Sequence, residues 1–258
     1  MNKENLIIMS SNEIDKMRTV GKLAAEMLFF LGSIVKPKIS TLDLDKAAIQ
    51  WAKEHNAINA PLGYKGFPKS ICTSVNEVVC HGIPNKKQIL QNGDIINIDV
   101  TLILDGYYGD TSKTFFVGNS NNKTKKLIEV TNECLKLAIK EVAINKRIGD
   151  IGNAIQTYAE SFGFGVVRDF VGHGIGKNFH TEPQVPHYGI KGNGRRLQEG
   201  MIFTIEPMIN IGTHKVKLLN DMWTVITQDK KFSAQFEHTI LVTKDGFEIL
   251  TLKENETF

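Results

Sequence analysis

Hydrophobic residues recur every three or four positions at the beginning of the chain, in two runs separated by a proline. This spacing predicts two amphipathic helices. Ser10, with Glu13 three residues later, forms a capping-box pattern at the start of the first helix, and Pro37 follows its end. Ser40 or Thr41 caps the second helix. The apolar face of this second helix consists of Leu44, Ala47, Ala48, Trp51 and Ala52.

A Gly- and Pro-rich segment from Ala57 to Lys69 interrupts the helical spacing and predicts a loop that displays Tyr64 and Phe67. Local packing is the commoner role of two loop aromatics. Two short β-rich pieces follow. They are Ser70–Thr73 and Glu77–Cys80.

Two further helices are predicted in the second half of the chain. The first extends from Asn121 to Ala143, and the next from Gly149 to Phe162, where Gly163 closes it. The remainder of this half is β-rich. The order of elements therefore resembles that of the first half.

The spacing of the helices indicates an internal repeat. Paired helices start about 29 residues apart in the first half (12 and 41) and about 28 apart in the second (121 and 149). We therefore expect an α+β fold in which a helix-helix-sheet unit occurs twice, related by a pseudo-twofold axis. The expected division is a single domain, 1–258, with repeats at about 10–118 and 119–252. A site in the cleft between the halves would take its ligands from both.

The stretch Asn97–Phe115 has the pattern of a β-hairpin. Apolar residues alternate along its first part, and a second β-rich run follows the dipeptide Asp105-Gly106, which is a strong signal for a two-residue turn. The alternating apolar positions are Ile98, Val100, Leu102 and Leu104.

The predicted turn sets the register of the two strands. Residues whose numbers sum to 211 lie opposite each other, so Thr101 faces Asp110 and Asp99 faces Ser112. Asp99 and Asp110 then become diagonal neighbours with Cβ atoms roughly 7 Å apart or less. Two carboxylates this close repel each other unless a cation lies between them. Surface positions on a solvated hairpin are the alternative, and a one-residue bulge would reverse the alternation.

Composition narrows the class of protein only modestly. The chain has 258 residues and a formal net charge of +3, which indicates neither a specific nucleic-acid partner nor a membrane surface. Cys72, Cys80 and Cys134 form neither a C-x-x-C motif nor an even set, so a reducing compartment is expected. The N-terminal stretch lacks the apolar core of a signal peptide, and the longest apolar run, Met27–Leu31, is too short to span a bilayer. We expect a cytoplasmic protein.

Further candidate ligands follow in the second half. His173 and His180 lie seven residues apart in a Gly-rich stretch, VGHGIGKNFHTEP, and Glu206 ends an apolar strand just before a proline. Glu237 lies inside another apolar strand, where a buried carboxylate without a partner is costly. A packed core histidine and a harmless strand end are the alternatives for His173 and Glu206.

The other histidines have weaker signals. His238 follows Glu237 and points to the opposite face of its strand, which indicates a structural role. No motif surrounds His55, His187 or His214, so surface or packing roles are expected for them.

The candidate ligands together comprise four carboxylates and one imidazole: Asp99, Asp110, His173, Glu206 and Glu237. Such a set exceeds what one ion usually needs and is typical of a two-metal site with bridging carboxylates. Its oxygen-rich chemistry suits Mn²⁺, Fe²⁺ or Co²⁺ and also accepts Zn²⁺. Two such ions lower the pKa of a bridging water towards neutrality, so hydrolysis is the reaction that this set favours.

The segments NIDVT, YGDTSKTF, GHGIGKNFHTEP, GMIFTIEPM and QFEHTILV occur in this order, and from about Ile14 to Leu250 the chain resembles the type I methionine aminopeptidases. The resemblance implies the pita-bread fold, the short bacterial or organellar form and a metallo-exopeptidase. Such enzymes remove the initiator methionine from nascent proteins with a small, uncharged second residue, using a metal-bridging hydroxide. The resemblance makes Asp99 a ligand of the first ion. It makes His173 and Glu206 ligands of the second ion, and Asp110 and Glu237 bridges.

The resemblance also implies roles in catalysis and substrate binding. His180 would hydrogen-bond the scissile carbonyl, His81 would contact the scissile nitrogen, and Glu206 would take the proton of the attacking water. Pro61 stands where many bacterial members have cysteine. The substrate pocket would comprise Tyr64, Phe67, Cys72, His81, Phe179, His180 and Trp223.

Partners follow from the same resemblance. The expected partners are nascent polypeptide N-termini and, transiently, the ribosome. The enzyme is expected to be a monomer. A monovalent cation would bind main-chain oxygens near Asn76, Val78 and Ser233.

Two other functions compete with this interpretation. One is a prolidase or Xaa-Pro aminopeptidase of the same fold. The other is a catalytically silent member that binds peptides or ribosomes, although such proteins typically lose metal ligands and all five are present here.

Overall fold

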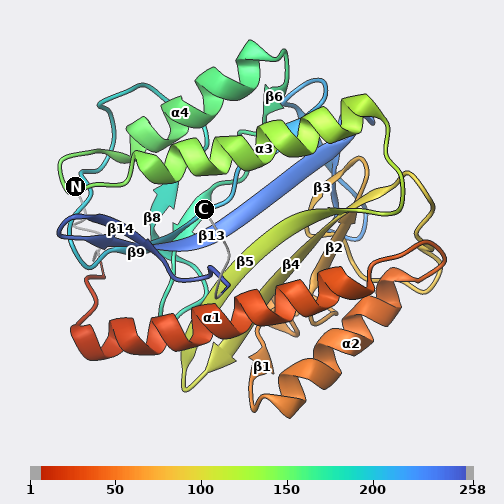
Figure 1. Ribbon diagram of the computed structural model, residues 1–258, viewed down its shortest axis with the longest axis horizontal. Coiled ribbons are helices and arrows are strands. Elements are labelled where there is room, and N and C mark those ends of the chain that lie inside the picture. The colour runs from red at the N-terminus through yellow and green to blue at the C-terminus, as the bar shows by residue number, and fades with distance from the viewer. Residues whose placement is uncertain (1–6, 254–258) are drawn as a thin grey trace.

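The computed structural model describes residues 7–253, in which four helices accompany a large curved sheet (Figure 1). Residues 1–6, on which part of the signal-peptide prediction falls, lie outside the described residues. The helices are α1 (Ser11–Ile34), α2 (Thr41–Glu54), α3 (Asn122–Lys140) and α4 (Ile148–Ser161), with a short 3₁₀ turn at Tyr64–Gly66. None of the helices in this described part is both long enough and apolar enough to cross a bilayer.

Within residues 7–253, the strands form one sheet of eleven strands and a smaller one of three. The central order of the large sheet is β1-β4-β5-β13-β9-β7-β8, and the small sheet has the order β11-β12-β3. The strands of the first half are β1 (Ile58–Asn59), β2 (Cys72–Val75), β3 (Val78–Cys80), β4 (Ile95–Leu104) and β5 (Tyr107–Phe116). Those of the second half are β6 (Gly165–Val166), β7 (Gly172–Gly174), β8 (Thr181–Val185), β9 (Ile202–Ile205), β10 (Met208–Asn210), β11 (Val216–Leu218), β12 (Val225–Thr227), β13 (Ser233–Thr243) and β14 (Gly246–Ile249).

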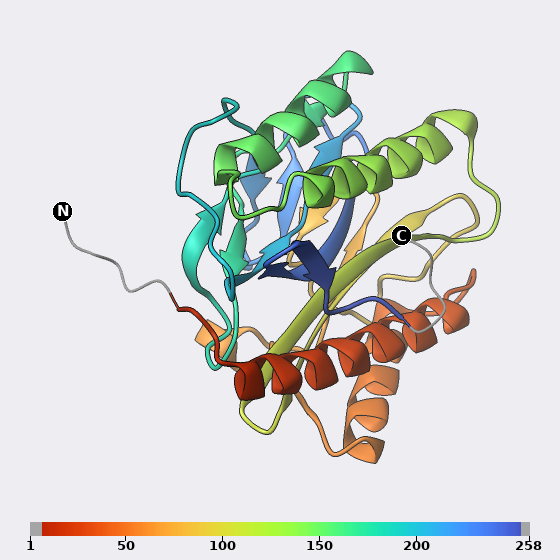
Figure 2. The same ribbon diagram turned by 60° about the vertical axis from the view of Figure 1, so that its left-hand side comes forward.

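The helices cover the sheet in two pairs. Figure 2 shows α1 and α2 (red and orange) below the long strands and α3 and α4 (green) above them. The helix α1 packs on β4 and β5, and α3 packs on β13. Each pair has its own buried apolar cluster, and β5 pairs with β13 where the two halves meet. The predicted α+β fold class is confirmed, and the exact division into repeats stays a prediction.

Local signals explain the helix ends. The Glu13 carboxylate accepts hydrogen bonds from the main-chain nitrogen and hydroxyl of Ser10, as the capping-box pattern predicts. Ser40 and Asp43 form a second reciprocal cap. The helix α3 ends at Lys140, three residues before the predicted Ala143, because the chain tightens into a turn in which Val142 N–H bonds the carbonyl of Ile139.

The strand predicted at Ser70–Thr73 begins two residues later, at Cys72. The reason is a contact with α2, because the main-chain nitrogen of Ser70 donates to Oδ1 of Asp45 at 2.8 Å. Ser70 is therefore held by a helix rather than by a strand ladder.

Candidate active site

The β4–β5 hairpin has the predicted register. Asp105 and Gly106 form the turn with φ values of 51° and 80°, Thr101 pairs with Asp110, and Asp99 pairs with Ser112. The hydroxyl of Thr101 donates to Oδ1 of Asp110 at 2.8 Å. This bond fixes one of the two carboxylates that the strands direct to the same place.

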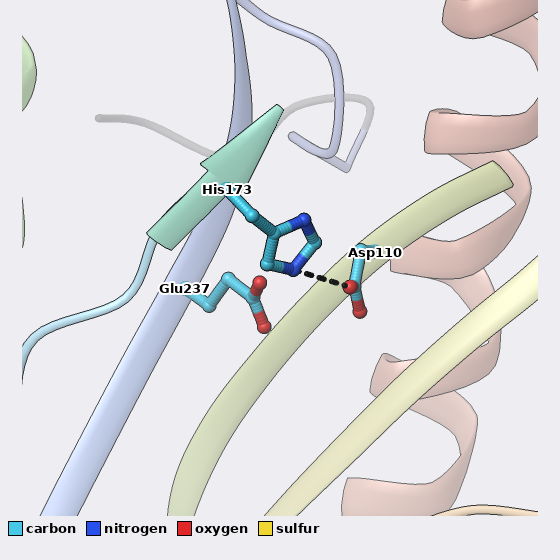
Figure 3. A group of neighbouring side chains, drawn as sticks. All are labelled: Asp110, His173 and Glu237. Carbon is cyan, nitrogen blue, oxygen red and sulfur yellow. Dashed lines mark ion pairs between the residues drawn. The ribbon is translucent and has the colours of Figure 1, made fainter. Parts of the chain in front are cut away.

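Three of the five predicted ligands converge closely. Asp110 on β5, His173 on β7 and Glu237 on β13 each present a ligand atom, and these atoms lie within 4.8 Å of one another (Figure 3). The Nε2 atom of His173 lies 3.6 Å from Oδ2 of Asp110. The two halves of the chain therefore contribute to one cluster.

Glu206 lies beside this cluster, between β9 and β10. Its Oε1 atom lies 3.8 Å from Nε2 of His173 and accepts a 2.8 Å hydrogen bond from the hydroxyl of Thr204. Its Oε2 atom accepts from Nε2 of Gln235 at 3.2 Å. Asp99 lines the same cavity. Burial is the main cause that raises the pKa values of Asp110 and Glu237, and the charge of Asp99 raises them further.

The imidazole of His173 presents a lone pair to the carboxylates. Its Nδ1 atom lies 3.1 Å from the carbonyl oxygen of Gly174, which can only accept, so Nδ1 carries the proton. Burial lowers the pKa of His173 to about 4 and keeps the ring neutral near pH 7. The free Nε2 atom is therefore available as a metal ligand.

The carboxylates are strongly perturbed. Burial raises the pKa of Asp99 to about 7 and that of Glu206 to about 8. Burial, reinforced by the neighbouring carboxylates, raises the pKa values of Asp110 and Glu237 well above their usual range. Four acidic groups in this small space cannot all be ionised without a compensating cation. This donor set, with hard oxygens, one imidazole nitrogen and no thiolate, fits divalent metal ions.

A cavity of about 320 Å³ opens above the cluster. Every residue predicted for the substrate pocket lines it, and so does Pro61: Pro61, Tyr64, Phe67, Cys72, His81, Phe179, His180 and Trp223. Lining residues that the sequence did not single out include Lys65, Thr101, Asp169, Phe170, Met208 and Gln235. Only Thr101 had a signal, its register position opposite Asp110.

Aromatic contacts shape the wall of this cavity. Tyr64 stacks on His180 with ring centroids 5.2 Å apart, and Trp223 meets Phe67 edge-on at 5.2 Å. Asp221 holds Trp223 by accepting its main-chain N–H at 2.9 Å. The aromatics predicted as local packing in the loop therefore also line the cavity.

Two more imidazoles face the cavity in neutral form. Burial lowers the pKa of His81 to about 4, and burial together with the nearby His173 lowers that of His180 to about 3. His81 has a φ of 55°, in the left-handed region that non-glycine residues seldom adopt. Outside the cavity, His238 binds Thr251 through Nδ1 at 2.9 Å, as expected of a structural residue.

The segments expected near a monovalent cation also meet. The main-chain nitrogen of Ser233 donates to the carbonyl of Asn76 at 2.8 Å, two residues before Val78 on β3. Cation binding at this place stays a prediction.

Comparison with known proteins places the chain in a family. Residues 15–244 match metallopeptidase family M24. Methionine aminopeptidase A of Synechocystis is 61% identical over 251 residues, which cover 97% of this chain and 99% of that protein. The chain belongs to the methionine aminopeptidases of family M24. This membership agrees with the resemblance carried by the sequence motifs.

The structural comparison agrees. The methionine aminopeptidase of Rickettsia prowazekii superposes with a TM-score of 0.95 and 55% identity, covering 96% of this chain and 100% of that one. A prolidase from Pyrococcus furiosus, with a TM-score of 0.78 and 20% identity over 96% of this chain and 66% of its own, shares the fold alone. The pita-bread fold expected for methionine aminopeptidases is confirmed.

Proposed function

We propose that this chain removes the initiator methionine from nascent proteins whose second residue is small and uncharged. The observation that carries the proposal is the convergence of Asp110, His173 and Glu237 from three strands at one end of an aromatic-lined cavity. The membership in the methionine aminopeptidases supports the same substrate class.

Five side chains would hold two divalent ions. By the resemblance to the methionine aminopeptidases, Asp99 would hold the first ion, His173 and Glu206 would hold the second, and Asp110 and Glu237 would be shared by both. When bound, the ions supply Lewis-acid polarisation of a carbonyl and lower the pKa of water to produce a nucleophile. The burial of four carboxylates in one cluster supports this assignment, because the cations offset a repulsion that would otherwise keep several of them protonated.

The catalytic groups of the chain have complementary tasks. Glu206 accepts the proton of the attacking water. His180 donates an imidazole N–H to the scissile carbonyl, and His81 contacts the scissile nitrogen. The lowered pKa values of His81 and His180 support the roles of these two residues, because a neutral imidazole donates one hydrogen bond without placing a positive charge beside the metal ions.

The cavity would bind the methionine side chain. The sulfur of an unbranched thioether makes favourable contacts with aromatic rings, and Tyr64, Phe67 and Trp223 provide such rings. Cys72 adds a small apolar surface, because burial raises its pKa and keeps the thiol protonated. Pro61 also lines this cavity.

Nascent N-termini are the proposed partners, with transient ribosome association, a monomeric enzyme and a cytoplasmic location as further parts of the proposal. A monovalent cation near Asn76, Val78 and Ser233 would brace β3 against β13.

Peptide hydrolysis tests the function directly. Chelator-treated protein reloaded with Mn²⁺ or Co²⁺ is expected to release methionine from Met-Gly and Met-Ala peptides at least about tenfold faster than from Met-Lys peptides, since one unfavourable contact of about 1.4 kcal/mol gives that factor. Equal rates on both would overturn the specificity. Cleavage of Ala-Pro peptides would indicate a prolidase instead, and no turnover with an empty metal site would indicate a silent binding module.

A further inference from the structure

His187 is a buried histidine in direct contact with the proposed catalytic machinery. Its exposed fraction is 0%, and its Nε2 atom accepts a hydrogen bond of 3.2 Å from the main-chain nitrogen of Glu206. An imidazole nitrogen that accepts carries no proton. The ring is therefore neutral, with its proton on Nδ1, an atom that has no hydrogen-bond partner among the described residues.

The N–H of Glu206 has no acceptor in the strand pairing of β9 with β13. Glu206 follows the last residue of β9, Ile205, whose partner on β13 is His238. The next residue, Pro207, has no N–H. The N–H of Glu206 thus lies just past the strand ladder, and the imidazole of His187 satisfies it.

We infer that His187 is a positioning residue that sets where the Glu206 carboxylate lies between the two strands. This inference rests on the proposed function, because it concerns how one of its metal ligands is held. Thr204 and Gln235 hold the carboxylate itself, from β9 and β13. His187 holds the main chain of Glu206 instead. The hydrogen bonds from Thr204 and Gln235 fix only the end of the Glu206 side chain, so the contact with His187 limits the movement of the residue that these two bonds leave possible.

The segment that carries His187 is clamped against α4. A Cβ atom at Gly152 would lie 2.4 Å from the carbonyl oxygen of Tyr188 and 2.7 Å from that of Pro186. Only a residue without a side chain allows this approach. The main-chain nitrogen of Gly189 also donates to Oε1 of Gln156 on α4 at 3.1 Å.

The contact with Gly152 connects α4 to Glu206, which lies beside the cluster of Asp110, His173 and Glu237. The carbonyl oxygens of the two residues flanking His187 lie against Gly152 of α4, while the His187 imidazole accepts the N–H of Glu206. The strand β8, which ends two residues before His187, pairs with β7, which carries His173. Displacement of the segment by even a few tenths of an ångström would therefore shift the acceptor of the Glu206 N–H.

Substitutions of His187 can distinguish the role of its hydrogen-bond acceptor from the role of its volume. His187→Gln keeps an oxygen near the position of Nε2, His187→Asn keeps a polar group only near Nδ1, and His187→Leu keeps volume alone. We expect the Asn and Leu variants to lose about 10- to 100-fold in kcat on a Met-Gly peptide with little change in KM, as partners of metal ligands typically do. The Gln variant is expected to stay within about threefold of the wild type.

Mn²⁺ binding to chelator-treated protein, measured by calorimetry, gives a second readout. The Asn and Leu variants should bind Mn²⁺ about 10- to 100-fold more weakly, and the Gln variant should bind it nearly as the wild type does. Gly152→Ala should also weaken Mn²⁺ binding, because its Cβ atom would displace the segment that carries His187. Thr157→Ala, at an exposed position of the same helix, is the matched control and should not.

Two results would overturn the inference: a Gln variant as impaired as the Leu variant, or Asn and Leu variants with wild-type kcat and Mn²⁺ affinity. A purely structural role would lower the melting temperature and leave both quantities unchanged. If the wild-type protein released no methionine, the proposed function would fail, and the Mn²⁺ affinities alone would decide the role of His187.

Discussion

The hydroxyl of Thr204 donates a 2.8 Å hydrogen bond to the carboxylate of Glu206. The same hydroxyl accepts the main-chain N–H of His173 at 3.1 Å, and Thr204 is fully buried. One oxygen atom therefore sets the relative position of two proposed ligands of the same ion.

Thr204→Val keeps the shape of this side chain and removes both hydrogen bonds. We expect a loss of about 1–3 kcal/mol in the free energy of unfolding, because the N–H of His173 stays buried without an acceptor. Affinity for Mn²⁺ should fall by about tenfold or more. Thr204→Ser keeps the hydroxyl and is the control. Urea unfolding and calorimetry measure both effects, and Mn²⁺ affinity equal to the wild type in the Val variant would refute the prediction.

The buried acidic groups make the stability of metal-free protein depend on pH. Burial raises the pKa values of Asp99 and Glu206 to about 7 and 8, whereas carboxyl groups of an unfolded chain titrate near pH 4. The folded state therefore holds extra protons between these values, and its stability falls as pH rises. Buried imidazoles make the stability rise with pH below about pH 6.5. The reason is that burial lowers their pKa values, so the unfolded chain binds more protons than the folded state there. These imidazoles are those of His81, His173, His180 and His187.

Above about pH 6.5 the imidazoles are neutral in both the folded and the unfolded state, so only the raised pKa values of the carboxyl groups make the stability depend on pH. We expect the free energy of unfolding of chelator-treated protein to fall between about pH 6.5 and 8, by about 1.4 kcal/mol per pH unit for each extra proton that the folded state holds. Saturating Mn²⁺ should remove this slope, because a cation favours the ionised carboxylates. Urea unfolding across this range is the measurement. Asp99→Asn should reduce the slope, and Asp15→Asn, at an exposed position on α1, should not.

The first half of the site could be predicted because its geometry is local. The turn at Asp105-Gly106 sits between two alternating strands, and a two-residue turn leaves one register. Asp99 and Asp110 follow from that register without knowledge of the rest of the chain. The helices were equally accessible, since capping residues and apolar spacing are both local signals.

The second half depends on contacts between distant segments. His187 has no motif around it, and its hydrogen bond to Glu206 joins segments far apart in the sequence, with the residues beside His187 packed against α4. Phe170 and Met208 likewise line the cavity from short strands and loops whose packing no local pattern encodes. Glu237 was recognisable as a costly buried carboxylate, and His173 and Glu206 were recognisable only as candidates, whereas the convergence of the three depends on the sheet order.

Side chains from both halves of the chain are proposed to form one site for two divalent ions. The most direct test is titration of chelator-treated protein with Mn²⁺ by calorimetry at neutral pH. Asp110→Asn and Glu237→Gln remove the proposed bridging ligands, and Asp15→Asn is the exposed control. We predict two ions per chain for the wild type and the control, with binding weakened by at least about 100-fold in both bridging variants. Absence of Mn²⁺ binding by the wild type, or unchanged binding by the bridging variants, would show that these side chains do not form a site for two ions.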